Sequence, residues 1–178
     1  MSRRVRLLVA VAAAGAVVLA ALLLVFQPWL LFVDVRVSDP LPTTRPLPSS
    51  PAAEPGTSGP RTLARGAFTS HEHATSGEAT IVENADGSRV LAIAGLDTSN
   101  GPDLHVWLSA SDVVEGTDGW YVAGSAPHID LGPLKGNVGD QVYDIPAEAD
   151  LTGVRSVAIW CVRFSVSFGA AQLDAAVD

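Results

Sequence analysis

The sequence is poor in several residues on which common functional sites depend. Its 178 residues include one cysteine, Cys161, and one methionine, Met1. A blue-copper site in its usual arrangement needs a histidine and an axial methionine shortly after its cysteine, and neither follows Cys161. Attached c-type haem requires C-x-x-C-H, and a structural zinc site usually takes more than one cysteine or a tight histidine pair. Residue counts therefore exclude these three kinds of site in their usual form.

Lysine and the common catalytic motifs are also scarce. Lys135 is the sole lysine, and the chain contains neither a G-x-S-x-G nucleophile elbow nor a G-x-x-x-x-G-K-[ST] phosphate-binding loop. The 19 acidic residues all follow the first apolar segment, and the formal net charge of the chain is −8. Because binding to nucleic-acid phosphates needs a basic surface, we expect no nucleic-acid partner. A hydrolase is the least supported class, since no nucleophile and base are paired.

The N-terminal region contains one long apolar run. Residues 7–26 carry no charge, and as a helix they would be about 30 Å long, the thickness of a bilayer core. Apolar residues continue through 27–33, and no A-x-A-like cleavage site follows. These features favour a retained transmembrane anchor at 7–33 over a cleaved signal peptide, which is the alternative.

The charges around the apolar run predict its orientation. Arg3, Arg4 and Arg6 precede it. By the positive-inside rule, residues 1–6 are expected in the cytoplasm and residues 34–178 outside it. We therefore predict a single-pass protein of the cell membrane with an extracytoplasmic C-terminal part. The preference for Arg over Lys, with abundant Ala, Val and Gly, suggests a high-GC bacterial source.

Residues 34–65 are expected to be an extracytoplasmic linker. Seven of the twelve prolines lie between residues 38 and 60. Such a composition favours extended chain with about 3 Å per residue, which would hold a domain roughly 50 to 70 Å from the membrane. A disordered connection of no particular length fits the same residues.

Residues 66–173 are expected to form the folded domain, followed by a tail at 174–178. Short runs of alternating apolar and polar residues are separated here by Gly, Asp, Asn and Pro. The runs ATIVE and SRVLAIA flank NADG, which predicts a β-hairpin with Asp86 and Gly87 in its turn. Other predicted strands are DLHVWLS, WYVAG, HIDLG, QVYDIP, SVAIWCVRF and SVSFGAAQL. This pattern predicts an all-β fold, an antiparallel and jelly-roll-like β-sandwich.

Histidines are the other candidate ligands. His71 and His73 lie two residues apart. On a strand they would share a face and could hold a metal, although surface or turn positions are the commoner outcome. His105 and His128 lie in strand-like runs without an adjacent ligand. The sequence therefore leaves any metal unidentified.

The lone thiol allows two interpretations. Both faces of the predicted strand around Cys161 are apolar, so the alternation does not tell which face meets the core. A free cysteine often serves as a small buried hydrophobic residue. Outside the cytoplasm an accessible lone thiol is prone to oxidation and mixed disulfides, so Cys161 is expected to be buried, ligated or used.

Four segments resemble the DM-thirteen domain, an electron-transfer-type module found beside DOMON domains in Skeletor-type proteins. They lie in the same order over about residues 66–173, and they are GAFTSHEHATSGEATI, NGPDLHVWLS, LGPLKGNVGDQVYDIP and SVAIWCVRFSVSFGAAQL. The resemblance implies a β-rich domain with one characteristic cysteine of proposed redox function, a bare thiol or a ligand to a prosthetic group such as haem. By position that cysteine is Cys161, with His73 in the EH segment and Asp103 in the GPDL segment as further cofactor-binding candidates.

Two function classes follow. The first is a membrane-anchored redox domain that exchanges electrons through Cys161 with a partner protein at the cell surface, holding haem or no cofactor. The second is a non-enzymatic β-sandwich that binds a ligand or a protein. His73 is the predicted ligand or proton partner of Cys161, because a neighbouring histidine favours the thiolate.

Overall fold

The computed structural model of the chain describes residues 2–43 and 59–175. The proline-rich residues 44–58 and the end of the predicted tail, 176–178, lie outside the described residues. The helices are α1 (Arg3–Phe26), η1 (Pro28–Phe32), η2 (Thr117–Tyr121) and α2 (Val122–Ser125), of which η1 and η2 are 3-10 helices. The strands are β1 (Arg36–Ser38), β2 (Arg61–Ser70), β3 (Ser76–Glu83), β4 (Arg89–Asp97), β5 (Leu104–Ser109), β6 (His128–Pro133), β7 (Val138–Ile145), β8 (Ser156–Cys161), β9 (Val166–Gln172) and β10 (Asp174–Ala175).

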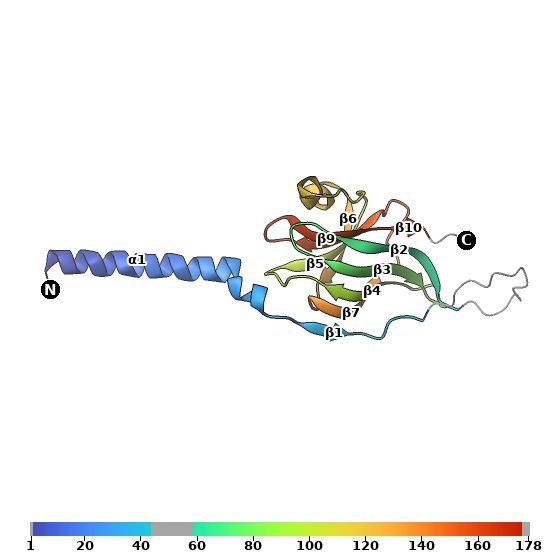
Figure 1. The fold of residues 1–178 in the computed structure, drawn as a ribbon, viewed down its shortest axis with the longest axis horizontal. Coiled ribbons are helices and arrows are strands. Elements are labelled where there is room, and N and C mark those ends of the chain that lie inside the picture. Colours follow the sequence, from blue (N-terminus) through green and yellow to red (C-terminus); the bar gives the residue numbers. More distant parts are fainter. Residues whose placement is uncertain (1, 44–58, 176–178) are drawn as a thin grey trace, which may run out of the picture.

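The strands form one curled sheet in the order β1-β7-β4-β3-β2-β9-β8-β5-β6, with β10 beside β2 (Figure 1). Strand β2 joins the two halves, because its first part pairs with β3 and Phe68–Ser70 pair with β9. Among the described residues every pair is antiparallel except β1 with β7, which is parallel. The predicted all-β, sandwich-like fold is confirmed, with a mixed rather than wholly antiparallel sheet.

The core lies inside the curl of the sheet. Alternate residues of the strands point inward, as the two-residue period of a strand requires. Ile81, Ile93 and Leu108 come from both halves and are at most 3% exposed. The NADG turn between β3 and β4 forms as predicted, with Gly87 at φ +83°, a conformation that favours glycine.

The half-sheet that contains β8 is covered on its outer face as well. Trp107 and Trp160 stack there with ring centroids 4.8 Å apart, and they pack with Ala123 of α2. Gly124 lies against Trp160, where a Cβ would come within 2.5 Å of the indole ring. The predicted strand WYVAG is therefore wrong, because this segment folds as η2 and α2 to cover the tryptophan pair.

The N-terminal region contains a long helix that ends before the apolar sequence does. Helix α1 is long and apolar enough to cross a membrane. It ends at Phe26 because Gln27 adopts a left-handed conformation, with φ 43° and ψ 52°, and Pro28 follows. The predicted anchor 7–33 thus consists of this helix and the short η1.

Both ends of the predicted linker, 34–65, contain strand. Arg36–Ser38 form β1 against β7, and β2 begins at Arg61. The buried side chain of Asn137 fixes the approach to β1, since it accepts a hydrogen bond from the Val35 amide at 2.7 Å and donates to the Thr98 carbonyl at 2.8 Å. The first strand of the sheet, β1, therefore follows η1 after only three residues.

Candidate functional site

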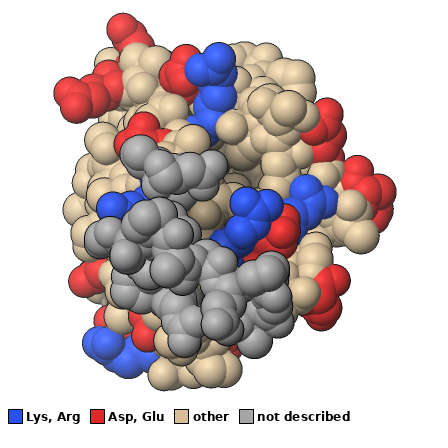
Figure 2. Space-filling view, turned by 90° about the vertical axis from the view of Figure 1, so that its right-hand side faces the viewer, with Lys and Arg blue, Asp and Glu red and all other residues tan. Residues whose placement is uncertain are grey.

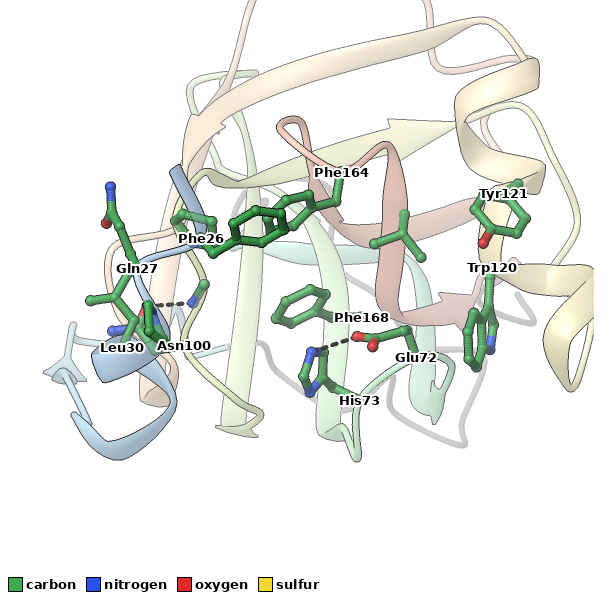
Figure 3. Close-up of a pocket in the computed structure, with 14 residues that line it drawn as sticks. Phe26, Gln27, Leu30, Glu72, His73, Asn100, Trp120, Tyr121, Phe164 and Phe168 are labelled. Carbon is green, nitrogen blue, oxygen red and sulfur yellow. Dashed lines mark hydrogen bonds and ion pairs between the residues drawn. The ribbon is translucent and has the colours of Figure 1, made fainter. Parts of the chain in front are cut away.

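A pocket of about 500 Å³ lies where α1 and η1 meet one end of the sheet (Figure 3). Aromatic side chains make up much of its wall. Phe26 and Leu30 come from the N-terminal helices, and Trp120 and Tyr121 come from η2 on the other side. Phe168 of β9 lies between them. The full lining comes from five segments that are far apart in the sequence, within residues 26–30, 72–73, 100–102, 120–121 and 164–168.

The turn between β8 and β9 closes the pocket against α1. Phe164 stacks on Phe26 with ring centroids 5.6 Å apart. The guanidinium of Arg163 donates to the Val25 carbonyl at 3.0 Å. Ser165 allows the tight turn by adopting a positive φ of 53°. These contacts join the end of α1 to the strand pair that contains Cys161.

The SHEH segment between β2 and β3 places His73 on the pocket wall. Its ring packs on Phe168 with centroids 3.9 Å apart, and its Nε2 lies 2.5 Å from a carboxylate oxygen of Glu72 (Figure 3). The amides of His71 and His73 both donate to the Phe168 carbonyl, which fixes this turn on β9. The site therefore combines aromatic surface with one imidazole and carboxylate pair.

His71 points to a different environment from His73. Its Nδ1 lies 2.9 Å from the Ser167 hydroxyl, and burial lowers the pKa of the imidazole, which favours the neutral form. The two histidine side chains thus contact different partners, Ser167 for His71 and Glu72 for His73. Within residues 2–43 and 59–175, no group of three or more His, Cys, Asp and Glu side chains is placed to hold a metal ion.

Cys161 lies in the core at the end of β8. Its side chain is 0% exposed, and it belongs to the inner apolar cluster with Val157 and Ile159. Burial raises the pKa of the thiol, while hydrogen bonding to the Phe164 and Arg163 amides acts in the opposite direction. Cys161 is thus a protonated thiol at neutral pH, beneath a turn whose amides favour its anion.

Asp103 is a neighbour of Cys161, and its carboxylate adds to the rise in the thiol pKa. Its carbonyl accepts a hydrogen bond from the Val162 amide at 2.9 Å. Its carboxylate lies 3.6 Å from Nε2 of His105, whose Nδ1 lies 2.8 Å from Asp130. Cys161 and Asp103 are thus neighbours, whereas His73 lies on the pocket wall, which Cys161 does not line.

One strand neighbour connects Cys161 to the pocket. Val166 of β9 is paired with Cys161 across the sheet, and Val166 lines the pocket. Cys161 itself does not line it. No hydrogen bond links Cys161 to His73 among the described residues.

A haem bound through Cys161 does not fit this arrangement. A thiolate ligand must be deprotonated and must face a space large enough for the macrocycle. The Cys161 side chain is instead fully buried among apolar residues, and burial raises its pKa. We therefore assign no step to a haem.

Sequence reasoning identified His73 but missed most of the pocket. Phe26 was assigned to the anchor and Trp120 to a strand, and neither assignment indicates that the two side chains share a cavity. The sequence signal nearest to the site is the aromatic content of the segments around Trp120 and Phe164. That signal is weak, because aromatic residues also build cores.

The comparisons with known proteins give one match. Residues 67–173 match a family model described as Electron transfer DM13. No curated protein and no solved structure shows significant similarity to the chain. The matched range contains every strand from β3 to β9, together with Cys161, His73 and Asp103.

Proposed function

The chain belongs to the DM13 electron-transfer family, and from this premise we propose that it is a membrane-anchored, extracytoplasmic redox domain with Cys161 as its redox-active side chain. The observation that carries the proposal is the position of Cys161 beside Val166, which lines a pocket open at the end of α1. A reactant in the pocket would be separated from the thiol by one side chain. The redox partner would therefore approach from the membrane-facing end.

The environment of Cys161 suits a thiol that reacts selectively. A protonated and buried thiol is protected from mixed disulfides, which threaten a lone cysteine outside the cytoplasm. The amides of Arg163 and Phe164 favour the thiolate and so lower the cost of deprotonating the buried thiol. One molecule of peroxide would oxidise the thiol to a sulfenic acid. Hydrogen peroxide would be reduced to water in this step, and an organic hydroperoxide would be reduced to its alcohol.

Peroxide treatment of the full chain in lipid nanodiscs tests this function. We expect a dimedone-type probe to trap a sulfenic acid at Cys161 in the native chain, and a thiol reductant to restore the thiol before trapping. Val162→Ala keeps the thiol and is the matched control, so its Cys161 should be trapped as in the native chain. Val162 lies in the same turn and is 40% exposed. A native thiol that stays unmodified, while the denatured chain reacts, contradicts the proposal.

A non-enzymatic ligand-binding domain is the second candidate. The observation that favours it is the full burial of Cys161 beside a preformed aromatic pocket. Here the thiol only fills volume, and Cys161→Ala would cost about 1 to 3 kcal/mol of stability through a small cavity. Ligand binding would persist, and no redox signal would be present to lose.

The proposed topology places residues 1–6 in the cytoplasm and the domain outside. It is supported by α1 and by the arginines at its start. Protease added to intact cells should cleave the chain after residue 33. Complete protection of the domain in intact cells, with cleavage after permeabilisation, would show the opposite orientation.

A further inference from the structure

The aromatic pocket has an unusual position relative to the anchor helix. Phe26, the last residue of α1, lines it together with Gln27, Pro28 and Leu30. If α1 crosses the membrane, this end of the helix lies at the outer lipid headgroups. Trp29 in η1 is 46% exposed, and tryptophan is favoured at that level of a bilayer. The mouth of the pocket would therefore face the outer surface of the membrane.

The chemistry of the wall selects a flat, uncharged ring. Phe26, Trp120, Tyr121, Phe164 and Phe168 supply aromatic surface for stacking. None of the fourteen described lining residues is Lys or Arg. A phospholipid headgroup would leave its phosphate without a cationic partner, which is unfavourable in an apolar pocket.

Polar groups on the wall match a ring that bears oxygen atoms. The His73 imidazole, held by Glu72, lies beside Phe168, and Asn100 and Tyr121 add an amide and a phenol (Figure 3). Each of these three side chains can donate a hydrogen bond to a ring carbonyl. The Glu72 carboxylate can accept one from a ring hydroxyl.

From these features we propose that the pocket binds the ring of an isoprenoid quinone dissolved in the membrane. The ring lies among Phe26, Phe164 and Phe168, its oxygens meet His73 and Tyr121, and the apolar tail stays in the bilayer. Isoprenoid quinones combine a flat oxygenated ring, no charge and redox activity with an apolar tail. The inference rests on the proposed membrane anchoring and electron-transfer function, and it concerns binding of the ring in the pocket, not a reaction of the ring with Cys161.

Quenching of tryptophan fluorescence by a decyl-substituted benzoquinone tests the proposal on the full chain in nanodiscs. All variants carry Trp29→Phe, which removes the tryptophan on the membrane side. Of the three tryptophans that remain, Trp120 lies in the pocket wall and reports on the ligand, while Trp107 and Trp160 stack on the outer face of the sheet and give a background that all variants share. We expect saturable quenching. Replacing Phe164 by Ala should weaken binding by about tenfold, because one stacking surface and its buried area are lost.

Two further variants keep the test independent of folding defects. Tyr121→Ala removes a side chain that is 59% exposed and should also weaken binding. Val162→Ala truncates a side chain that is 40% exposed, as is Phe164, in the same turn but outside the pocket, and it should leave binding unchanged. Equal quenching in all three variants, or quenching that does not saturate, overturns the proposal.

A final comparison separates the ligand class from the proposed function. A decyl-substituted cyclohexane added to the nanodiscs should not compete with the quinone, and full competition would show a site for apolar chains instead. The fluorescence measurement does not involve the thiol of Cys161. Saturable binding with an unreactive Cys161 contradicts the redox assignment of the thiol alone, whereas a reactive Cys161 without binding contradicts the pocket assignment alone.

Discussion

Tyr143 shows how one buried side chain links the stability of this fold to pH. Its hydroxyl donates to Oε1 of Gln141 at 2.7 Å and accepts from the Lys135 amide at 3.0 Å. Burial raises the pKa of Tyr143 from 10.0 to about 12. The folded chain therefore holds this proton more tightly than the unfolded chain does.

The raised pKa of Tyr143 predicts a loss of stability in alkali. Its contribution is fully present below pH 10 and is lost as the pH rises through about 12. We expect the free energy of unfolding to fall by about 2 to 3 kcal/mol over this range on account of Tyr143. Denaturant unfolding at several pH values measures this fall, and Tyr143→Phe should remove it. An identical alkaline slope in the variant contradicts the assignment.

The elements of this fold differ in how well the sequence alone indicates them. The β3–β4 hairpin was predictable because its signal is local, with Asp86 and Gly87 between two alternating runs. Strand β1 was not, because its partner β7 is about a hundred residues away and its three residues carry no pattern of their own. Helices η2 and α2 were missed for a similar reason, since they form where the outer tryptophan pair needs a cover.

Asn137 is the residue that we expect to hold β1 in the sheet. It is 1% exposed, and its side chain binds the Val35 amide, Asp34 and the Thr98 carbonyl. Asn137→Ala leaves these groups without their partner and should cost about 3 kcal/mol. Hydrogen exchange should become faster at Val35 and in β1. Asn84→Ala is the control, because Asn84 makes its side-chain hydrogen bond to Ser88 in an exposed hairpin.

The pocket and helix α1 lie at the same end of the domain (Figure 1). Helix α1 extends from the end of the domain that contains the pocket (Figure 1). At the opposite end, Lys and Arg residues are interspersed with Asp and Glu residues (Figure 2). The pocket could not be predicted from the sequence, because its wall comes from the end of α1 with η1, the SHEH turn, the loop at 100–102, η2 and the β8–β9 turn with β9, which meet only in the folded chain. Family resemblance identified the candidate residues Cys161, His73 and Asp103. It gives no information on the distances between these three side chains in the folded chain.

Docking of the domain onto the end of α1 predicts a specific crosslink. The Asn100 amide group donates to the Val33 carbonyl at 3.2 Å. With Cys161→Ala as the background, Val33→Cys and Asn100→Cys should be joined within one chain by a short bis-maleimide in nanodiscs. Val33→Cys with Asp174→Cys should not react, because β10 lies at the end of the domain away from α1 (Figure 1). Equal crosslinking of both pairs would indicate a freely tethered domain.

Protein-film voltammetry of the full chain in a supported bilayer measures the exchange of electrons through Cys161. We predict a signal in the native chain that is retained in Asn84→Ala and absent in Cys161→Ala, while circular dichroism shows the same β fold in all three. The same signal in Cys161→Ala, or no signal in the native chain, would contradict the account.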